Sequence, residues 1–227
     1  DSQDVCLFTF FQAKIFQHLA GGGTVAYRTE GDVDTALLIY RHIPLDLVSV
    51  SDGYHQIYKI PELIDLINKS SNVLVMGHRF ADLDALGSSV GVAMISKALH
   101  KDAKIVMNTK TTLAMPLAKH LSSNGMENLI IEPEEVESYL NADTLLVIVD
   151  THRKSFLEYP ELFDLVQKVI VIDHHRKTVD HINKAVIFYH EPNASSASEM
   201  VTELIEYIRM LECNDVLNWY KKKDKNM

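Results

Sequence analysis

The 227-residue sequence has few cysteines, no long hydrophobic run and no excess of basic residues. Its two cysteines, Cys6 and Cys213, lie far apart and outside any metal-ligand spacing, which favours a reduced cytosolic compartment over a disulfide framework. No run approaches the roughly 18–20 apolar residues that a membrane-spanning helix needs. With 22 basic and 31 acidic residues, the net charge is −9, which argues against a duplex-DNA binder that works by neutralising phosphates. A soluble globular chain is expected.

Phosphate-binding glycine motifs are also missing. The triplet Gly21–Gly23 lacks both the G-x-G-x-x-G spacing and the lysine of a P-loop, so we interpret it as an ordinary turn. The chain begins at Asp1 rather than Met, and we therefore expect a longer parent that carries any targeting or membrane segments. We assign no function to residues 1–58.

From residue 59 onward, short apolar runs alternate with segments of helical periodicity. This alternation predicts βαβ units, and hence an α/β fold with a mainly parallel sheet and helices on both faces. Small residues near the start of the second predicted helix would allow close packing. The predicted strands are Asn72–Met76, Ala103–Met107, Thr144–Val149, Val169–Ile172 and an edge strand at Ala185–Phe188. The predicted helices are those after Pro61 and at Ala85–Leu99, Pro116–Leu121, Pro133–Leu140, Leu162–Val166 and Ser195–Met210.

Acidic and histidine side chains follow three of these apolar strands. They are His78, Asp82 and Asp84 after the first, Asp150 after the second, and Asp173, His174 and His175 at the end of the third. Any one acid could be a helix cap or a turn residue, and Asp82 or Asp84 could cap the helix near Ala85. In open α/β sheets, however, ligands bind outside the carboxyl ends of the strands. Together, the three clusters favour a metal site.

Carboxylate and imidazole ligands without thiolate suit Mn²⁺, Mg²⁺ or Fe²⁺ better than a structural zinc. Asp82 and Asp84 can point to two different ions, and Asp150 is placed to bridge them. Two ions about 3.5–4 Å apart would activate a water and clamp the attacking and leaving oxygens. The substrate that needs such a clamp is a phosphate ester or anhydride.

These residues resemble the first three motifs of the DHH phosphoesterase superfamily, which includes pyrophosphatases, the exonuclease RecJ and nanoRNases. The flanking stretches resemble one branch in particular, the GdpP-type cyclic-di-AMP phosphodiesterases. The stretches are 75–80, 144–154, 173–176 and 191–199, and the resemblance covers about residues 60–210.

The resemblance implies a role for each site residue. His78, Asp82 and Asp150 would hold one Mn²⁺, and Asp84, Asp150 and His174 would hold the other. His175 and Arg176 would act at the scissile phosphate or leaving oxygen. Ser195 and Ser196 would receive a substrate phosphate at the start of the last helix, with an ordinary N-cap as the alternative. Asp173 would orient a histidine from behind the ligands.

The sequence departs from that family after residue 210. We find neither the fourth acidic motif, which completes the second metal site, nor the Gly-Gly-Gly-His-type motif of the DHH-associated domain. The second metal site could therefore be incomplete. We divide the chain into an unassigned extension at 1–58, in the place of a degenerate GGDEF domain, a DHH domain at 59–212 and a basic tail at 213–227.

The leading hypothesis is a manganese-dependent, cytoplasmic phosphodiesterase that hydrolyses cyclic-di-AMP to 5′-pApA, with a parent at the inner face of the membrane. One alternative is a nanoRNase or oligonucleotide phosphodiesterase, which would yield AMP. Another is a catalytically impaired remnant that binds nucleotide or regulates a partner. The expected ligand is a cyclic dinucleotide, duplex nucleic acid is not expected, and a homodimer is compatible with the resemblance.

Overall fold

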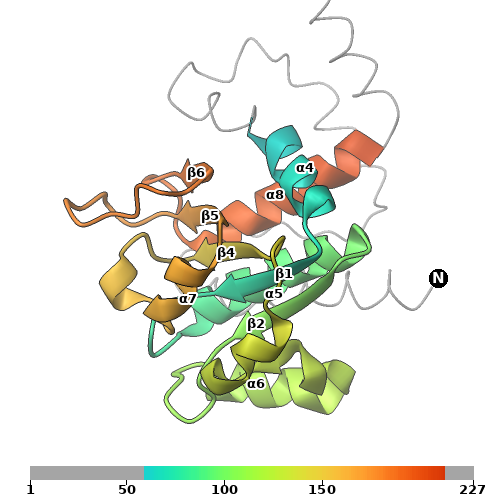
Figure 1. Ribbon diagram of the computed structural model, residues 1–227, viewed down its shortest axis with the longest axis vertical. Coiled ribbons are helices and arrows are strands. Elements are labelled where there is room, and N and C mark those ends of the chain that lie inside the picture. Colours follow the sequence, from blue (N-terminus) through green and yellow to red (C-terminus); the bar gives the residue numbers. More distant parts are fainter. Residues whose placement is uncertain (1–58, 213–227) are drawn as a thin grey trace, which may run out of the picture. The chain divides into compact units, whose positions relative to one another are not determined.

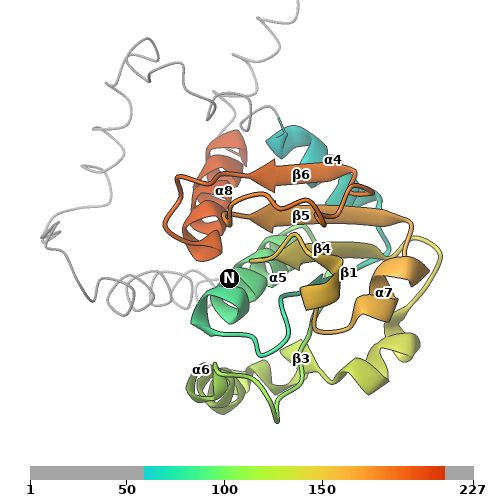
Figure 2. The same ribbon diagram turned by 90° about the vertical axis from the view of Figure 1, so that its left-hand side faces the viewer.

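Six parallel strands form a single sheet in the computed structural model, which describes residues 59–212 and the side chains of 59–208 (Figure 1). The strand order is β3-β2-β1-β4-β5-β6. Figure 2 shows β5 and β6 side by side with their arrowheads in the same direction. The strands are β1 (Asn72–Met76), β2 (Asp102–Val106), β3 (Ile130–Ile131), β4 (Leu145–Val149), β5 (Lys168–Asp173) and β6 (Ile187–His190). The expected parallel α/β fold is confirmed.

Helices cover both faces of the sheet, as predicted. The α-helices are α4 (Ile60–Lys69), α5 (Leu83–Ala98), α6 (Met115–Leu121), α7 (Pro160–Leu165) and α8 (Ala197–Glu212). Shorter helical segments are η2 (Ser122–Met126), η3 (Glu127–Leu129), η4 (Pro133–Tyr139) and η5 (Lys154–Phe156). No helix within residues 59–212 is long and apolar enough to cross a bilayer.

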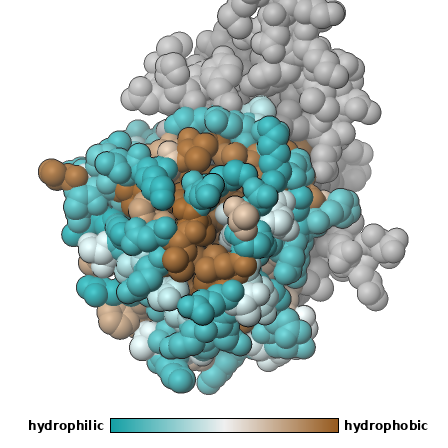
Figure 3. All heavy atoms as spheres, in the orientation of Figure 1, coloured by the Kyte–Doolittle hydropathy of each residue, from teal (hydrophilic) through white to brown (hydrophobic). Residues whose placement is uncertain are grey.

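Alternation along the strands divides the core into two layers. On one face, Leu146 and Ile148 of β4 pack with Val136 of η4 and Leu162 of α7. On the other face, Val147 lines a small apolar cavity together with residues of α4, α5 and α8. All five residues of β1 and all five of β4 are buried, as expected for central strands covered on both sides. Figure 3 shows mainly hydrophilic side chains around the rim of the visible face and hydrophobic ones near its centre.

Close packing of α5 against α8 depends on two glycines. A Cβ on Gly87 would lie 2.9 Å from Ser198 Oγ, and a Cβ on Gly91 would lie 2.5 Å from Val201 Cγ1. Both distances are too short for ordinary contacts. The prediction that small residues near the start of this helix allow close packing is therefore confirmed.

Several element boundaries differ from the sequence-based expectation. The edge strand begins at Ile187 rather than Ala185, and the segment after Pro133 is a 3₁₀ helix. The last helix begins at Ala197, so Ser195 and Ser196 precede it. Strand β3 was missed because two residues are too few to show a period. The proposed extension at 1–58 and the tail at 213–227 lie outside the described residues.

The strand order places a switch point between β1 and β4. From β1 the chain adds β2 and β3 on one side, and it then returns to add β4, β5 and β6 on the other. In open α/β sheets, ligands bind at the carboxyl ends of the strands where the order reverses. The residues that follow β1 and β4 are therefore the first place to look for a site.

Candidate metal centre

Asp150 occupies the centre of the carboxyl edge of the sheet, directly after β4. Its side chain is 3% exposed, and its backbone adopts a left-handed conformation with φ of +58°. Such a φ is uncommon outside glycine, although Asp tolerates it better than most residues. Among the described residues, its Oδ1 has no hydrogen-bond partner. A buried carboxylate oxygen without a donor is costly unless a cation or another donor compensates it.

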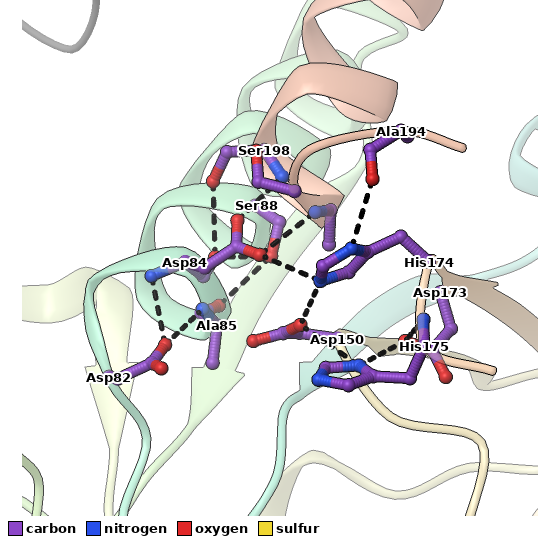
Figure 4. Close-up of polar contacts among 12 residues, drawn as sticks. Asp82, Asp84, Ala85, Ser88, Asp150, Asp173, His174, His175, Ala194 and Ser198 are labelled. Atoms are coloured by element: carbon purple, nitrogen blue, oxygen red, sulfur yellow. Dashed lines mark hydrogen bonds and ion pairs between the residues drawn. The ribbon is translucent and has the colours of Figure 1, made fainter. Parts of the chain in front are cut away.

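Two histidines approach Asp150 from neighbouring strands, His78 from the loop after β1 and His174 from the end of β5. His78 Nε2 lies 3.5 Å from Asp150 Oδ2, and His174 Nε2 lies 3.5 Å from Asp150 Oδ1. Figure 4 shows His174 and His175 beside Asp150, with Asp84 and Asp150 facing the same nitrogen of His174. Asp150 thus faces a different imidazole with each oxygen.

Both imidazoles present Nε2 to the site because Nδ1 is already bonded to backbone. His78 Nδ1 lies 2.8 Å from Arg79 O, and His174 Nδ1 lies 3.2 Å from Ala194 O. A carbonyl oxygen can only accept, so Nδ1 carries a proton in both rings. Metal-ligating histidines typically donate their other N–H to a carbonyl or carboxylate in this way. The donor chemistry therefore fits a hard or borderline divalent cation.

The first predicted ligand set is brought together in full. One ligand atom each from His78, Asp82 and Asp150 lie within 4.8 Å of one another. Asp82 also caps α5, because its Oδ1 accepts hydrogen bonds from Asp84 N at 2.9 Å and Ala85 N at 3.0 Å. The capping role considered from the sequence is therefore real, and the same oxygen lies 3.8 Å from His78 Nε2.

Charge within this set shifts three pKa values. The carboxylates of Asp150 and then Asp82 raise the pKa of His78 to about 10. His78 in turn lowers the pKa of Asp82 to about 2. Burial raises the pKa of Asp150 to about 6, against the opposing effect of His78. A protonated His78 thus lies between two carboxylates, 3.5 Å from Asp150 and 3.8 Å from Asp82.

The second predicted set is only partly brought together. The convergent group on this side contains Asp150, His174 and His175, with His175 in place of Asp84. Asp84 Oδ2 lies 3.6 Å from His174 Nε2. Its oxygens accept hydrogen bonds from Ala197 N at 2.9 Å and Ser198 N at 2.7 Å, so Asp84 caps α8. Asp84 as a metal ligand stays a prediction.

His175 has one ring nitrogen bonded to a carboxylate. Its Nδ1 lies 2.8 Å from Asp173 Oδ1, and its backbone N–H donates to the same oxygen at 3.2 Å. Burial lowers the pKa of His175, but the carboxylates of Asp173 and Asp150 together outweigh burial and the net shift is upward. His175 Nδ1 also lies 3.6 Å from Asp150 Oδ1, and a role for His175 beside the ligands stays a prediction. Arg176 follows it in the chain and is exposed.

The two serines before α8 bond to Glu199. Ser195 donates to Glu199 Oε2 through its N–H at 2.7 Å and its hydroxyl at 2.6 Å. Ser196 Oγ accepts from Glu199 N at 3.0 Å, which is the N-cap interaction considered as the alternative. Asp84 already accepts hydrogen bonds from the backbone N–H groups of Ala197 and Ser198, so these two groups are not free to bind a phosphate. Phosphate binding by the two serines stays a prediction.

His152 lies close to the candidate site, and sequence reasoning gave it no role. It is 2% exposed, and its Nδ1 hydrogen-bonds to Asp173 Oδ2. The signal was its place two residues after Asp150 within the stretch 144–154. Its partner Asp173, the expected orienting residue, indeed contacts two histidines.

Comparison with known proteins places this geometry in a family. The family model described as the N-terminal domain of the DHH family matches residues 72–224. The chain belongs to the DHH family. The cyclic-di-AMP phosphodiesterase GdpP of Bacillus subtilis is 36% identical over 164 residues, which make up 68% of this chain and 25% of that protein. PdeA of Listeria monocytogenes, named in the same way, is 38% identical over 66% of this chain and 23% of its own length.

This DHH chain therefore spans about a quarter of the length of the curated relatives that it matches. Among solved structures, an exopolyphosphatase-related protein from Bacteroides fragilis has a TM-score of 0.47 at 19% identity, over 65% of this chain and 43% of that one. The region matched by the DHH family model, residues 72–224, contains all the predicted site residues.

Proposed function

We propose that this chain is the metal-binding domain of a phosphodiesterase that hydrolyses cyclic-di-AMP to 5′-pApA. The observation that supports it most is the position of Asp150, buried and facing His78 with one oxygen and His174 with the other. The two relatives named as cyclic-di-AMP phosphodiesterases supply the substrate class. Manganese, the cytoplasmic location and a homodimer belong to the same proposal.

In this proposal, His78, Asp82 and Asp150 hold one divalent cation, and Asp84, Asp150 and His174 hold the second. When bound, the cations lower the pKa of a water molecule and offset negative charge on the phosphate. The chain's own residues set the geometry. Arg79 O and Ala194 O fix the two imidazoles with Nε2 toward the site. Asp84 would have to share its oxygens between a cation and the N–H groups of α8.

His175 and Arg176 are proposed to act on the phosphate. Asp173 holds Nδ1 of His175, so Nε2 can donate a proton to a phosphate or leaving oxygen when the ring is protonated on both nitrogens. Arg176 adds a guanidinium from the same loop, and its planar fork suits phosphate oxygens.

The test is incubation of the 227-residue chain with Mn²⁺ and cyclic-di-AMP, followed by chromatographic separation of products. We expect pApA from the wild type and none from Asp150→Asn. Asp65→Asn provides a matched control, because Asp65 is an exposed partner of Lys69 on α4. AMP formed from linear dinucleotides, without cleavage of the cyclic substrate, would replace this proposal with the oligonucleotide phosphodiesterase. Manganese binding without any turnover would favour the impaired remnant.

A further inference from the structure

A chain of three side chains, two of them buried and the third exposed, adjoins the candidate metal centre. His152, Asp173 and His175 are joined in that order, and the first two are 2% and 0% exposed. We propose that His152 is a positioning residue, which fixes the His175 ring through Asp173. The proposal rests on the role given to His175 in the proposed function.

Hydrogen bonds assign the proton on His152. The backbone N–H of Thr178 donates to His152 Nε2 at 3.2 Å, which requires a lone pair on that nitrogen, and Thr178 Oγ1 lies 3.1 Å from the same nitrogen. The ring proton therefore lies on Nδ1, which donates to Asp173 Oδ2. His152 acts in this arrangement as a fixed donor to one oxygen of a fully buried carboxylate.

Asp173 transmits this contact to His175. With Oδ2 bonded to His152, Asp173 directs Oδ1 to the backbone N–H and to Nδ1 of His175, at 3.2 and 2.8 Å. His190 Nε2 also lies 2.6 Å from His175 O, so the backbone of His175 is held independently. What Asp173 adds is the direction of the imidazole, with Nε2 left for the site.

The position of His152 is set by the same strands that build the metal centre. It follows Asp150 by two residues after β4, and Asp173 ends the adjacent strand β5. The loop after β5 is fastened to it, because Ile182 N donates to His152 O at 2.7 Å. Asp150 and His152 thus both follow the end of β4. Asp150 lies in the candidate site, and His152 lies next to it, against Asp173.

Loss of His152 would leave Asp173 buried with one oxygen unbonded. A buried acceptor without a donor is costly, so the carboxylate would rotate toward other donors or admit water. The His175 ring would then lose its fixed orientation. Outer partners of this kind typically change activity by about 10–100-fold.

Two amide substitutions separate positioning from mere packing. In His152→Asn the amide nitrogen can take the place of Nδ1 and keep the donor to Asp173. In His152→Gln the amide lies near the place of Nε2, which keeps the Thr178 contact and loses the donor to Asp173. His120→Gln is the matched control, because His120 is exposed on α6.

We expect kcat for cyclic-di-AMP cleavage to fall about 10–100-fold in His152→Gln, with KM and Mn²⁺ affinity nearly unchanged. His152→Asn should retain about tenfold more kcat than His152→Gln. Equal loss in both variants, or a loss that follows their melting temperatures, would mean that His152 only packs the loop and would overturn the proposal.

A second readout needs no turnover. Nitrogen-15 NMR of the histidine rings in the metal-free wild type should show the Nδ1–H tautomer at His152. The His175 ring signals should shift in His152→Gln and stay close to wild type in His152→Asn. An Nε2–H tautomer at His152 overturns the proposal. If the wild type shows no turnover but the NMR spectra are as expected, the phosphodiesterase proposal fails. The inference that His152 positions the His175 ring through Asp173 then still holds.

Discussion

The two groups of side chains around Asp150 are organised differently. On the His78 side, the partners His78 and Asp82 lie four residues apart in one loop that runs into α5. On the His174 side, the contacts join segments far apart in sequence, and Asp84 bonds to N–H groups 113 and 114 residues away. The first group is assembled locally, whereas the second depends on where α8 docks.

Both proposed cation sites share a carboxylate with a helix cap, but to different extents. Only Oδ1 of Asp82 caps α5, within the same loop, whereas both oxygens of Asp84 cap the distant α8. A carboxylate at a helix N-terminus is stabilised by the unsatisfied N–H groups there. A cation on the His174 side would have to share Asp84 with that cap. We therefore expect the His78 side to bind the first ion.

The largest expected effect comes from removing the shared residue. Asp150→Asn should weaken Mn²⁺ binding on both sides by more than the roughly 100-fold typical of outer-shell changes, because a direct ligand is lost. His78→Gln and His174→Gln should each lose one ion, with the tighter one lost in His78→Gln. Calorimetric titration gives stoichiometry and affinity for all three. Two ions still bound by Asp150→Asn with wild-type affinity would rule out the bridging assignment.

The next effect concerns the packing of α8. Gly91→Ala puts a Cβ 2.5 Å from Val201 Cγ1, so α5 and α8 must separate or Val201 must move. Overpacking of this kind costs about 1–3 kcal/mol in the free energy of unfolding, which denaturant titration measures.

Gly125→Asn is the control for that experiment, because Gly125 has a φ of +79° and open space around it. Asparagine tolerates such a φ better than most residues. If the comparison between the two sides is right, Gly91→Ala weakens the second ion more than the first. Equal weakening of both ions would contradict it.

The smallest effect is proton release on metal binding. His78 has a pKa of about 10 in the metal-free site, so at pH 8 it is protonated and must lose that proton to ligate. One proton should therefore leave per first ion at pH 8, and affinity should rise about tenfold per pH unit up to about pH 10. Below about pH 6, Asp150 also binds a proton and the dependence should steepen.

Calorimetry in two buffers of different ionisation enthalpy counts these protons. His174→Gln is the control, since it keeps the His78 side and should keep the release. No proton release at pH 8 would show that His78 is not the first ligand.

The sequence was enough to predict the part of the fold that positions the site. Strands β1, β4 and β5 are continuous apolar runs that end in acids or histidines, and burial on both faces requires that composition. The sequence could not show β3, because two residues carry no periodicity. The sequence also could not locate the first residue of α8. This helix begins at Ala197, and the preceding Ser195 and Ser196 form hydrogen bonds with Glu199.

For the candidate site, the sequence by itself determined which acidic and histidine side chains follow the strands and which of them share a strand end. That followed because parallel strands deliver their carboxyl ends to one edge of a sheet. Only the tertiary structure decided that Asp84 caps α8, that Asp150 faces His78 and His174 with different oxygens, and that His152 lies behind Asp173. These contacts depend on the side-by-side order of strands and on helix docking, which residue spacing along the chain does not encode.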